Sequence, residues 1–137
     1  MDGECVEFIT TDSRATDIAA FFGGFTAAEG CFTRTGRRFR FAIGLAAADS
    51  GMCIAFARIL DCGTVHRYPR RRPHYDDEVV FVVQSHRDLV DVVVPFMDAH
   101  LPPSYKRSQY VAWRAKLLDY WEHRSRSRRA RRSGGPA

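Results

Sequence analysis

The chain has 137 residues, 45% of them hydrophobic, which allows one folded domain with a buried core and predicts no second domain. Its net charge of +5 and its pI of about 9.3 favour a polyanionic partner. The apolar runs are interrupted or too short to cross a bilayer, and the first residues carry no signal-peptide pattern. We therefore expect a soluble, cytoplasmic protein with no membrane partner.

The first element in chain order is a helix that begins near residue 12 or 13, where an aspartate or a serine can cap it, and runs to residue 28. Large apolar residues at helical spacing are predicted on one side of this helix: Ile18, Phe21, Phe22 and Phe25. Its second half has two pairs of small residues one turn apart, Gly23 with Ala27 and Gly24 with Ala28. Two adjacent glycines inside a helix cost about 1 kcal/mol each relative to alanine, so we expect this bare face to admit another backbone at close range.

The helix ends on one carboxylate, Glu29, which Gly30 follows. The C-terminal end of a helix carries partial negative charge, so a carboxylate there is unfavourable unless a positive partner such as a metal ion lies beside it. Glu29 is therefore a candidate functional residue. The alternative interpretation is a solvated surface acid, with Gly30 as a C-cap and the two glycines as ordinary helix breakers.

Two β-hairpins are predicted on either side of a second helix. In the first, residues 31–35 and 38–43 alternate apolar with polar around a turn at Gly36 and Arg37. Its core-facing residues would be Phe32, Phe39, Phe41 and Ile43, and its exposed, basic face would carry Thr33, Thr35, Arg37 and Arg40. The second helix starts after Asp49 and breaks at Gly63, and the second hairpin pairs residues 64–68 with 79–84 across an arginine-rich loop.

A third helix is predicted over residues 87–96, ended by Pro95 together with Pro102 and Pro103. A last helix covers residues 104–123. The following segment is rich in arginine and has no apolar period. We expect one domain over residues 1–122 and a disordered basic tail over residues 123–137, which adds non-specific attraction to phosphate or serves only as a solubilising end.

The four cysteines, Cys5, Cys31, Cys53 and Cys62, have no CxxC spacing and lie among apolar neighbours. This pattern predicts neither a zinc site nor a disulfide framework, and we expect buried free thiols.

Residues 22–30 resemble, without a gap, the signature nonapeptide of the LAGLIDADG homing endonucleases, with Glu29 at the position of the family's metal-binding acid. The family's earlier acid, which is not the metal-binding one, falls on Ala27. The order helix, hairpin, helix, hairpin, helix, helix over residues 10–122 is similar to the family's αββαββα unit. Further landmarks are Gly63, the helix ending at Pro95 and Phe96, and Lys106 followed by Tyr110 and Trp113.

The resemblance implies an α+β fold of αββαββα type with an antiparallel DNA-binding sheet. It also implies a site-specific endonuclease that hydrolyses double-stranded DNA with Mg²⁺ or another divalent metal, encoded by an intron or another mobile element. Single-motif members act as homodimers, so Glu29 of both copies would bind the metal at a dimer interface made by Gly23, Gly24, Ala27 and Ala28. A two-fold axis also supplies the identical partner backbone that a bare helix face needs.

Lys106 matches the position of a basic catalytic residue in many members, where an ammonium group stabilises developing phosphorane charge or orders the attacking water; its other interpretation is a solvated helix lysine. The expected DNA contacts on the exposed sheet face are Thr33, Thr35, Arg37, Arg40, His66, Tyr68 and Arg70. Where the family often places a polar, water-positioning side chain, after the second strand, this chain has alanines at residues 46–48.

Those alanines leave a second hypothesis open: a cleavage-deficient protein of the same fold that acts as a DNA-binding regulator or as an RNA splicing maturase, in which case RNA would be a partner. A third hypothesis is an unrelated small RNA-binding αβ protein, which would require an exposed aromatic pair on its strands. Phe39 and Phe41, the closest candidates for that pair, are predicted to be buried.

Overall fold

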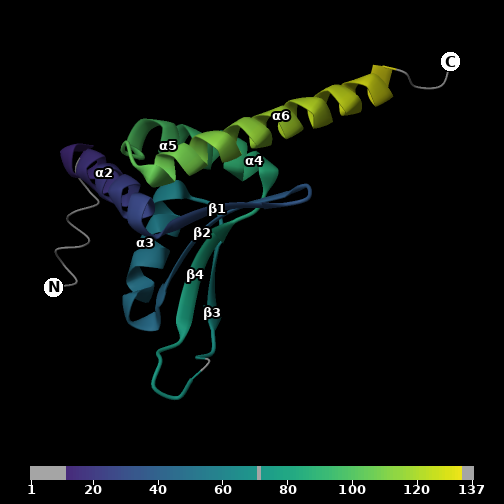
Figure 1. Cartoon of the computed structure of the whole chain (residues 1–137). Coiled ribbons are helices and arrows are strands. Elements are labelled where there is room, and N and C mark those ends of the chain that lie inside the picture. The colour runs from purple at the N-terminus through teal and green to yellow at the C-terminus, as the bar shows by residue number, and fades with distance from the viewer. Residues whose placement is uncertain (1–11, 71, 134–137) are drawn as a thin grey trace.

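The computed structural model describes residues 12–70 and 72–133 (Figure 1). Its four strands are β1 (Gly30–Thr35), β2 (Arg38–Ala46), β3 (Thr64–Tyr68) and β4 (Glu78–Val83). Its helices are α2 (Asp12–Glu29), α3 (Ser50–Leu60), α4 (His86–Asp88), α5 (Val94–His100) and α6 (Tyr105–Ser133), with a 3-10 turn η1 (Ala47–Asp49) and a π-helical segment η2 (Leu89–Val93). Among these helices none is long and apolar enough to span a membrane.

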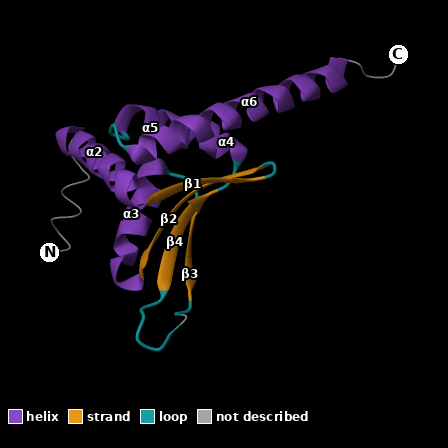
Figure 2. Ribbon diagram, viewed as in Figure 1, coloured by secondary structure: helices purple, strands orange, loops and turns teal. Residues whose placement is uncertain are grey.

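The strands form one antiparallel sheet in the order β1-β2-β4-β3. The β1–β2 hairpin and the β3–β4 hairpin therefore lie side by side, with β2 and β4 in the centre of the sheet. The helices within residues 12–133 lie on one side of the sheet and leave its other face open (Figure 2). The predicted α+β architecture with two hairpins is confirmed.

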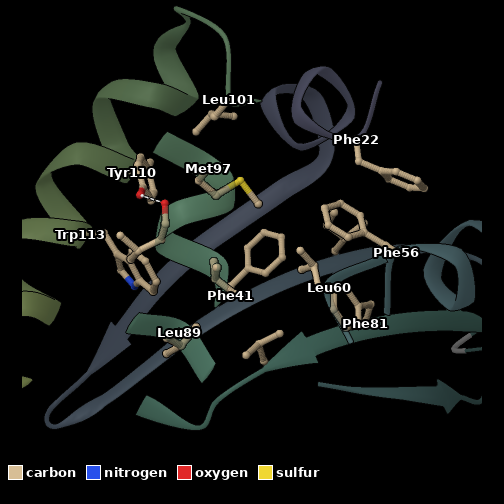
Figure 3. Packing of buried hydrophobic residues seen from close by; sticks show 14 of the residues in the cluster. Phe22, Phe41, Phe56, Leu60, Phe81, Leu89, Met97, Leu101, Tyr110 and Trp113 are labelled. Carbon is tan, nitrogen blue, oxygen red and sulfur yellow. Dashed lines mark hydrogen bonds between the residues drawn. The ribbon is translucent and has the colours of Figure 1, made fainter. Parts of the chain in front are cut away.

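The core lies between the covered face of the sheet and the helices (Figure 3). Phe39, Phe41 and Ile43 alternate along β2 and are all buried, as the period of two predicts. The ring of Phe41 packs 6.0 Å from the ring of Phe56 in α3 and 6.1 Å from the ring of Phe81 in β4. Aromatic packing thus joins the sheet to the helix layer.

The start of α6 is fixed to α5 by polar contacts as well as by packing. The hydroxyl of Tyr110 donates to the carboxylate of Asp98 at 2.6 Å and to the carbonyl of Val94 at 3.1 Å. Arg114 forms an ion pair with the same carboxylate at 3.1 Å. Burial, followed by the hydrogen bond to Asp98, raises the pKa of Tyr110, so the phenol keeps its proton and its hydrogen bond at neutral pH.

The prediction that Pro95 ends the third helix is wrong. The helical segment runs from α4 through η2 to the end of α5 at His100. The N–H of Val94 donates to the carbonyl of Leu89, five residues back, and Pro95 sits in the first turn of α5. This wider π turn accommodates a ring that would clash with the carbonyl four residues back in a regular α-helix.

The segment after His123 also differs from the prediction, because α6 continues as a helix to Ser133 instead of ending in a disordered tail. Two local contacts accompany this extension. Arg126 pairs with Glu122 one turn earlier at 2.5 Å, and the guanidinium of Arg124 lies 5.8 Å from the ring centroid of Trp121. Residues 134–137 lie outside the described residues.

Two smaller predictions need correction. Helix α3 ends at Leu60, before Gly63, because Asp61 adopts a left-handed conformation with φ of 52°. Cys31 is exposed on β1, whereas Cys53 is buried and Cys62 half-buried, all three as free thiols. Cys5 lies outside the described residues.

Candidate nucleic-acid interface and the end of helix α2

The open face of the sheet carries most of the predicted DNA contacts. Because Phe39 and Phe41 point into the core, their neighbour Arg40 and the residues paired with it point to the open face. The register places Thr33 opposite Arg40, Thr35 opposite Arg38, His66 opposite Val80 and Tyr68 opposite Glu78. The threonines, Arg40, His66 and Tyr68 therefore share one surface, as the alternation predicts.

Arg40 lies at the centre of this surface. It lines three adjoining hollows, one toward Tyr68 and Arg70, one toward Thr33 and Thr35, and one toward His66. Its Nε is buried and has no hydrogen-bond partner among the described residues. A buried guanidinium nitrogen without an acceptor is costly, so this position is poised to gain from an anionic or carbonyl ligand.

Arg37 does not lie on the strand face. It occupies the turn between β1 and β2, where Gly36 has φ of 61°, and its carbonyl accepts a hydrogen bond from Nε2 of His86 at 2.9 Å. Arg38 takes the outward position opposite Thr35. The alternation of side chains in β2 predicts that Arg37 is not on the open face, because residues 37 and 39 of an extended chain point to the same side and Phe39 is in the core.

Arg70 lies in the loop between β3 and β4, and its backbone is anchored there by a hydrogen bond. Its backbone N–H donates to Asp77 at 2.9 Å, and Nε of Arg67 donates to the same carboxylate at 3.0 Å. The Arg70 N–H, followed by the Arg67 side chain, lowers the pKa of Asp77. The loop is thus anchored at the edge of the open face.

The same loop is tied to the alanines that follow β2. The N–H of Ala47 donates to the carbonyl of Asp77 at 2.7 Å, and the N–H of Ala48 donates to the carboxylate of Asp76 at 3.0 Å. Sequence reasoning did not assign a role to Asp76 or Asp77. Their sequence signal is that two adjacent aspartates suit a turn. Their contacts with Ala47 and Ala48 have no local signal, because those alanines lie about thirty residues earlier in the chain.

The small-residue face of α2 is divided between two environments. A Cβ added to Gly23 would lie 2.0 Å from the carbonyl oxygen of His100, so the backbone of α2 already meets the end of α5 at close range. A Cβ added to Gly24 would have no atom within 4 Å. Ala27 is half-buried against the core, whereas Ala28 is exposed. Of the four residues predicted at a dimer interface, Gly24 and Ala28 therefore face outward in the single chain.

The outward side of α2 is also apolar. Phe21 is 52% exposed and lies one turn before Gly24, with its ring 6.0 Å from that of Phe25. An exposed phenylalanine beside two uncovered small residues is typical of a surface that another molecule covers.

Glu29 is the last residue of α2 and is exposed. The chain turns at once into β1, and a Cβ on Gly30 would lie 2.6 Å from Cγ2 of Thr26, so this turn needs a glycine. Gly30 pairs with Ile43 as a strand residue and is not a left-handed C-cap. The close turn fixes the glutamate at the junction of helix and sheet.

Lys106 is the second residue of α6 and is half-buried. No hydrogen bond or ion pair joins Lys106 to Glu29 in the described part of the chain. No group of three or more His, Cys, Asp or Glu residues within residues 12–70 and 72–133 is arranged to hold a metal ion. A metal site at Glu29 would thus require further ligands, such as a second copy of Glu29.

No protein-family profile matches the sequence, and no curated protein sequence matches it. Solved structures do match the fold. The meganuclease I-SmaMI bound to uncleavable DNA has a TM-score of 0.66 and 18% identity over 77% of this chain and 38% of its own. The LAGLIDADG meganuclease I-CpaMI bound to uncleaved DNA has a TM-score of 0.62 and 19% identity over 77% of this chain and 39% of its own.

A third structure, the homing endonuclease I-TnaI, has a TM-score of 0.60 and 22% identity over 73% of this chain and 71% of its own. The present chain therefore spans less than two fifths of I-SmaMI and I-CpaMI but is similar in length to I-TnaI. The chain has the fold of the LAGLIDADG homing endonucleases.

The two glycines of α2 are expected to respond in opposite ways to the same substitution. Gly23→Ala should lower the free energy of unfolding by about 1–3 kcal/mol, because the new methyl group would meet the His100 carbonyl. Gly24→Ala should leave it unchanged or raise it by up to about 1 kcal/mol, because alanine is the better helix former and the position is open. Urea unfolding at concentrations where both variants sediment as monomers measures the difference; equal destabilisation by both would contradict the division of this face.

Proposed function

We propose that this chain is a site-specific DNA endonuclease that works as a homodimer and hydrolyses phosphodiester bonds with Mg²⁺ or another divalent metal. The observation that carries the proposal is the position of Glu29, an exposed carboxylate at the junction of α2 and the sheet in a LAGLIDADG fold, next to an uncovered small-residue surface. I-SmaMI and I-CpaMI were crystallised with DNA, which supports duplex DNA as the substrate.

The uncovered small residues on the outer side of α2 support the proposed dimer. Two copies related by a two-fold axis can bring Gly24 and Ala28 of one chain against the same residues of the other, because neither position carries a bulky side chain. Phe21 would be covered in the same contact. Such an arrangement brings the two Glu29 side chains together at the end of the helix pair.

Two converging carboxylates repel each other unless a cation lies between them, and their hard oxygen atoms suit Mg²⁺. A structure of I-SmaMI with DNA and calcium ions supports a divalent metal in this fold. A bound divalent ion would supply an activated water and stabilise the leaving oxygen. In this proposal Glu29 of each copy binds the metal, and Lys106 stabilises charge on the phosphate.

The open sheet face would hold the duplex. A β-ribbon fits the major groove, where threonine and arginine side chains can reach base edges while arginines also bind phosphate. The proposed contacts are Thr33, Thr35, Arg37, Arg40, His66, Tyr68 and Arg70, with Arg38 added because of its outward position. Arg37 would contact DNA from the turn, beyond the end of the strands.

A cleavage-deficient regulator or splicing maturase is the second candidate, and the end of β2 is the observation that favours it. The alanines at residues 46–48 offer no polar side chain, and the N–H groups of Ala47 and Ala48 already donate to the β3–β4 loop. No water-positioning group comes from this segment. The cleavage experiment that follows separates the two candidates.

Glu29→Gln is expected to reduce cleavage at least about a hundredfold, because an amide cannot replace a metal-bound carboxylate. The assay is incubation of a randomised duplex-DNA library with Mg²⁺, followed by sequencing of the broken ends. Asp119→Asn, which neutralises an exposed carboxylate on α6, is the control and should cleave like the parent. Recurrent, roughly palindromic cuts that persist in Glu29→Gln would refute the metal role of Glu29. No cuts by the parent, with enrichment of bound sequences, would favour the cleavage-deficient candidate.

Gly24→Leu is expected to prevent dimerisation without unfolding the chain, because a leucine has open space in the protomer but would separate two closely packed helices. Gly51→Leu is a matched control, since Gly51 is also a helical glycine with no atom within 4 Å of an added Cβ. Sedimentation velocity should give a monomer for Gly24→Leu and a dimer for the parent and for Gly51→Leu. A dimer of Gly24→Leu as stable as that of the parent would place the interface elsewhere.

A further inference from the structure

The core-facing stripe of α6 continues past the end of the core. Tyr110, Trp113 and Leu117 occupy this stripe and are buried. The same helical spacing then leads to Trp121, Arg124 and Arg128. The face of the helix that stabilises the fold in its first half thus presents one aromatic ring and two guanidinium groups in its second half.

These three residues line a hollow together with the start of α4. The hollow measures about 530 Å³, and its lining residues are Ser85, His86, Arg87, Trp121, Arg124 and Arg128. The ring of His86 lies nearly parallel to that of Trp121, at 18° and 6.4 Å between centroids. Arg124 lies over the same tryptophan at 5.8 Å. The aromatic rings therefore hold part of the basic lining in place.

The charges of the hollow are of one sign. Its lining includes three arginines and no carboxylate. Arg87 approaches Asp91 only at 3.8 Å, with both side chains largely exposed, and such a pair contributes little. The nearby Glu122 is paired with Arg126 at 2.5 Å. An anionic ligand would balance the positive charge of these arginines.

The hollow adjoins the open face of the sheet. His86 lines both this hollow and the one beside Thr33, Thr35 and Arg38, and its Nε2 donates to the Arg37 carbonyl in the β1–β2 turn. Ser85 lines both this hollow and the one beside His66. Shared residues make one surface that runs from the sheet around the β1–β2 turn to α6, whose second half projects beyond the body of the protein (Figure 1).

We propose that this hollow binds the phosphate backbone of the DNA duplex where the duplex passes beyond the sheet, with Arg87, Arg124 and Arg128 as the phosphate contacts. The proposal rests on the proposed function, because continuity with the sheet face is what selects DNA as the occupant. From Trp121 to Arg128, the part of α6 that lines the hollow, the helix extends about 10 Å, which corresponds to about three base pairs. The bound site should therefore extend by about that length at each end of a dimer's target.

The test uses the duplex enriched from the randomised library, shortened one base pair at a time from its ends. We compare the parent with Arg124→Gln/Arg128→Gln and with Arg126→Gln/Arg129→Gln. The second variant removes the same charge from residues of α6 that do not line the hollow. Equilibrium binding is measured over a series of salt concentrations.

For the parent, affinity should fall as the outer three or so base pairs are removed. Arg124→Gln/Arg128→Gln should bind the full duplex about tenfold or more weakly at physiological salt, with a salt slope smaller by about 1.8 per protomer, and should be insensitive to removal of the outer base pairs. The control variant should stay closer to the parent in all three measurements. On the shortest duplex the parent and both variants should bind alike.

Equal salt slopes and equal length dependence for the two double variants would overturn this inference while leaving DNA binding by the sheet intact. So would weakened binding of single-stranded RNA with unchanged binding of duplex DNA, since that would assign the hollow to another ligand. Failure of the parent to bind any duplex would overturn the proposed function and this inference with it.

Discussion

The close contact between the backbone of α2 and the end of α5 is the constraint on which the rest of the structure depends. Gly23 allows this contact, because any side chain there would overlap the His100 carbonyl. Once α2 is fixed, the tight turn at Gly30 determines where β1 begins and where Glu29 lies. One uncrowded helix backbone thereby sets the relative positions of the helix layer, the sheet and the candidate catalytic carboxylate.

Helix α2 has a second side with small residues, Gly24 and Ala28, which is exposed in the single chain. A monomer gains nothing from an exposed glycine in a helix, which lowers stability by about 1 kcal/mol relative to alanine. A two-fold related copy would use that site for the same kind of close contact that Gly23 makes within the chain. In the proposed function this second copy supplies the other Glu29, since residues 12–70 and 72–133 of one chain hold no group of three or more His, Cys, Asp or Glu residues for a metal ion.

The open face of the sheet and the second half of α6 make one surface of mostly positive charge. Next to Arg40 this surface has an apolar part, because Ala42, Val80 and Val82 form a small buried cluster on β2 and β4. Arg40 rises beside this cluster with an unsatisfied nitrogen. Polar and basic groups around an apolar strip suit a ligand with a charged backbone and less polar base edges.

Local patterns in the sequence predicted much of this fold. The alternation in β2 identified its buried residues. Helical spacing and a capping residue identified α2, whose predicted end at residue 28 is one residue short of Glu29. Local patterns could not distinguish Gly23 from Gly24, because only the position of α5 makes one of them an internal contact. Nor could they predict the π turn that carries a helix through Pro95, or the continuation of α6 through an arginine-rich segment. The anchoring of the β3–β4 loop by Asp76 and Asp77 likewise depends on partners in the turn η1, which folding brings close.

The central claim is that two copies of α2 meet through their outer small-residue sides, and cross-linking of Ala28→Cys tests it most directly. The substitution is made in a Cys31→Ser background, because Cys31 is an exposed native thiol. A disulfide requires Cα atoms within about 7 Å, so only a close helix pair can form it. Mild oxidation should give a covalent dimer with Ala28→Cys and none with Ala112→Cys, an exposed position on α6. A protein that sediments as a dimer but yields no Ala28→Cys cross-link would contradict the account.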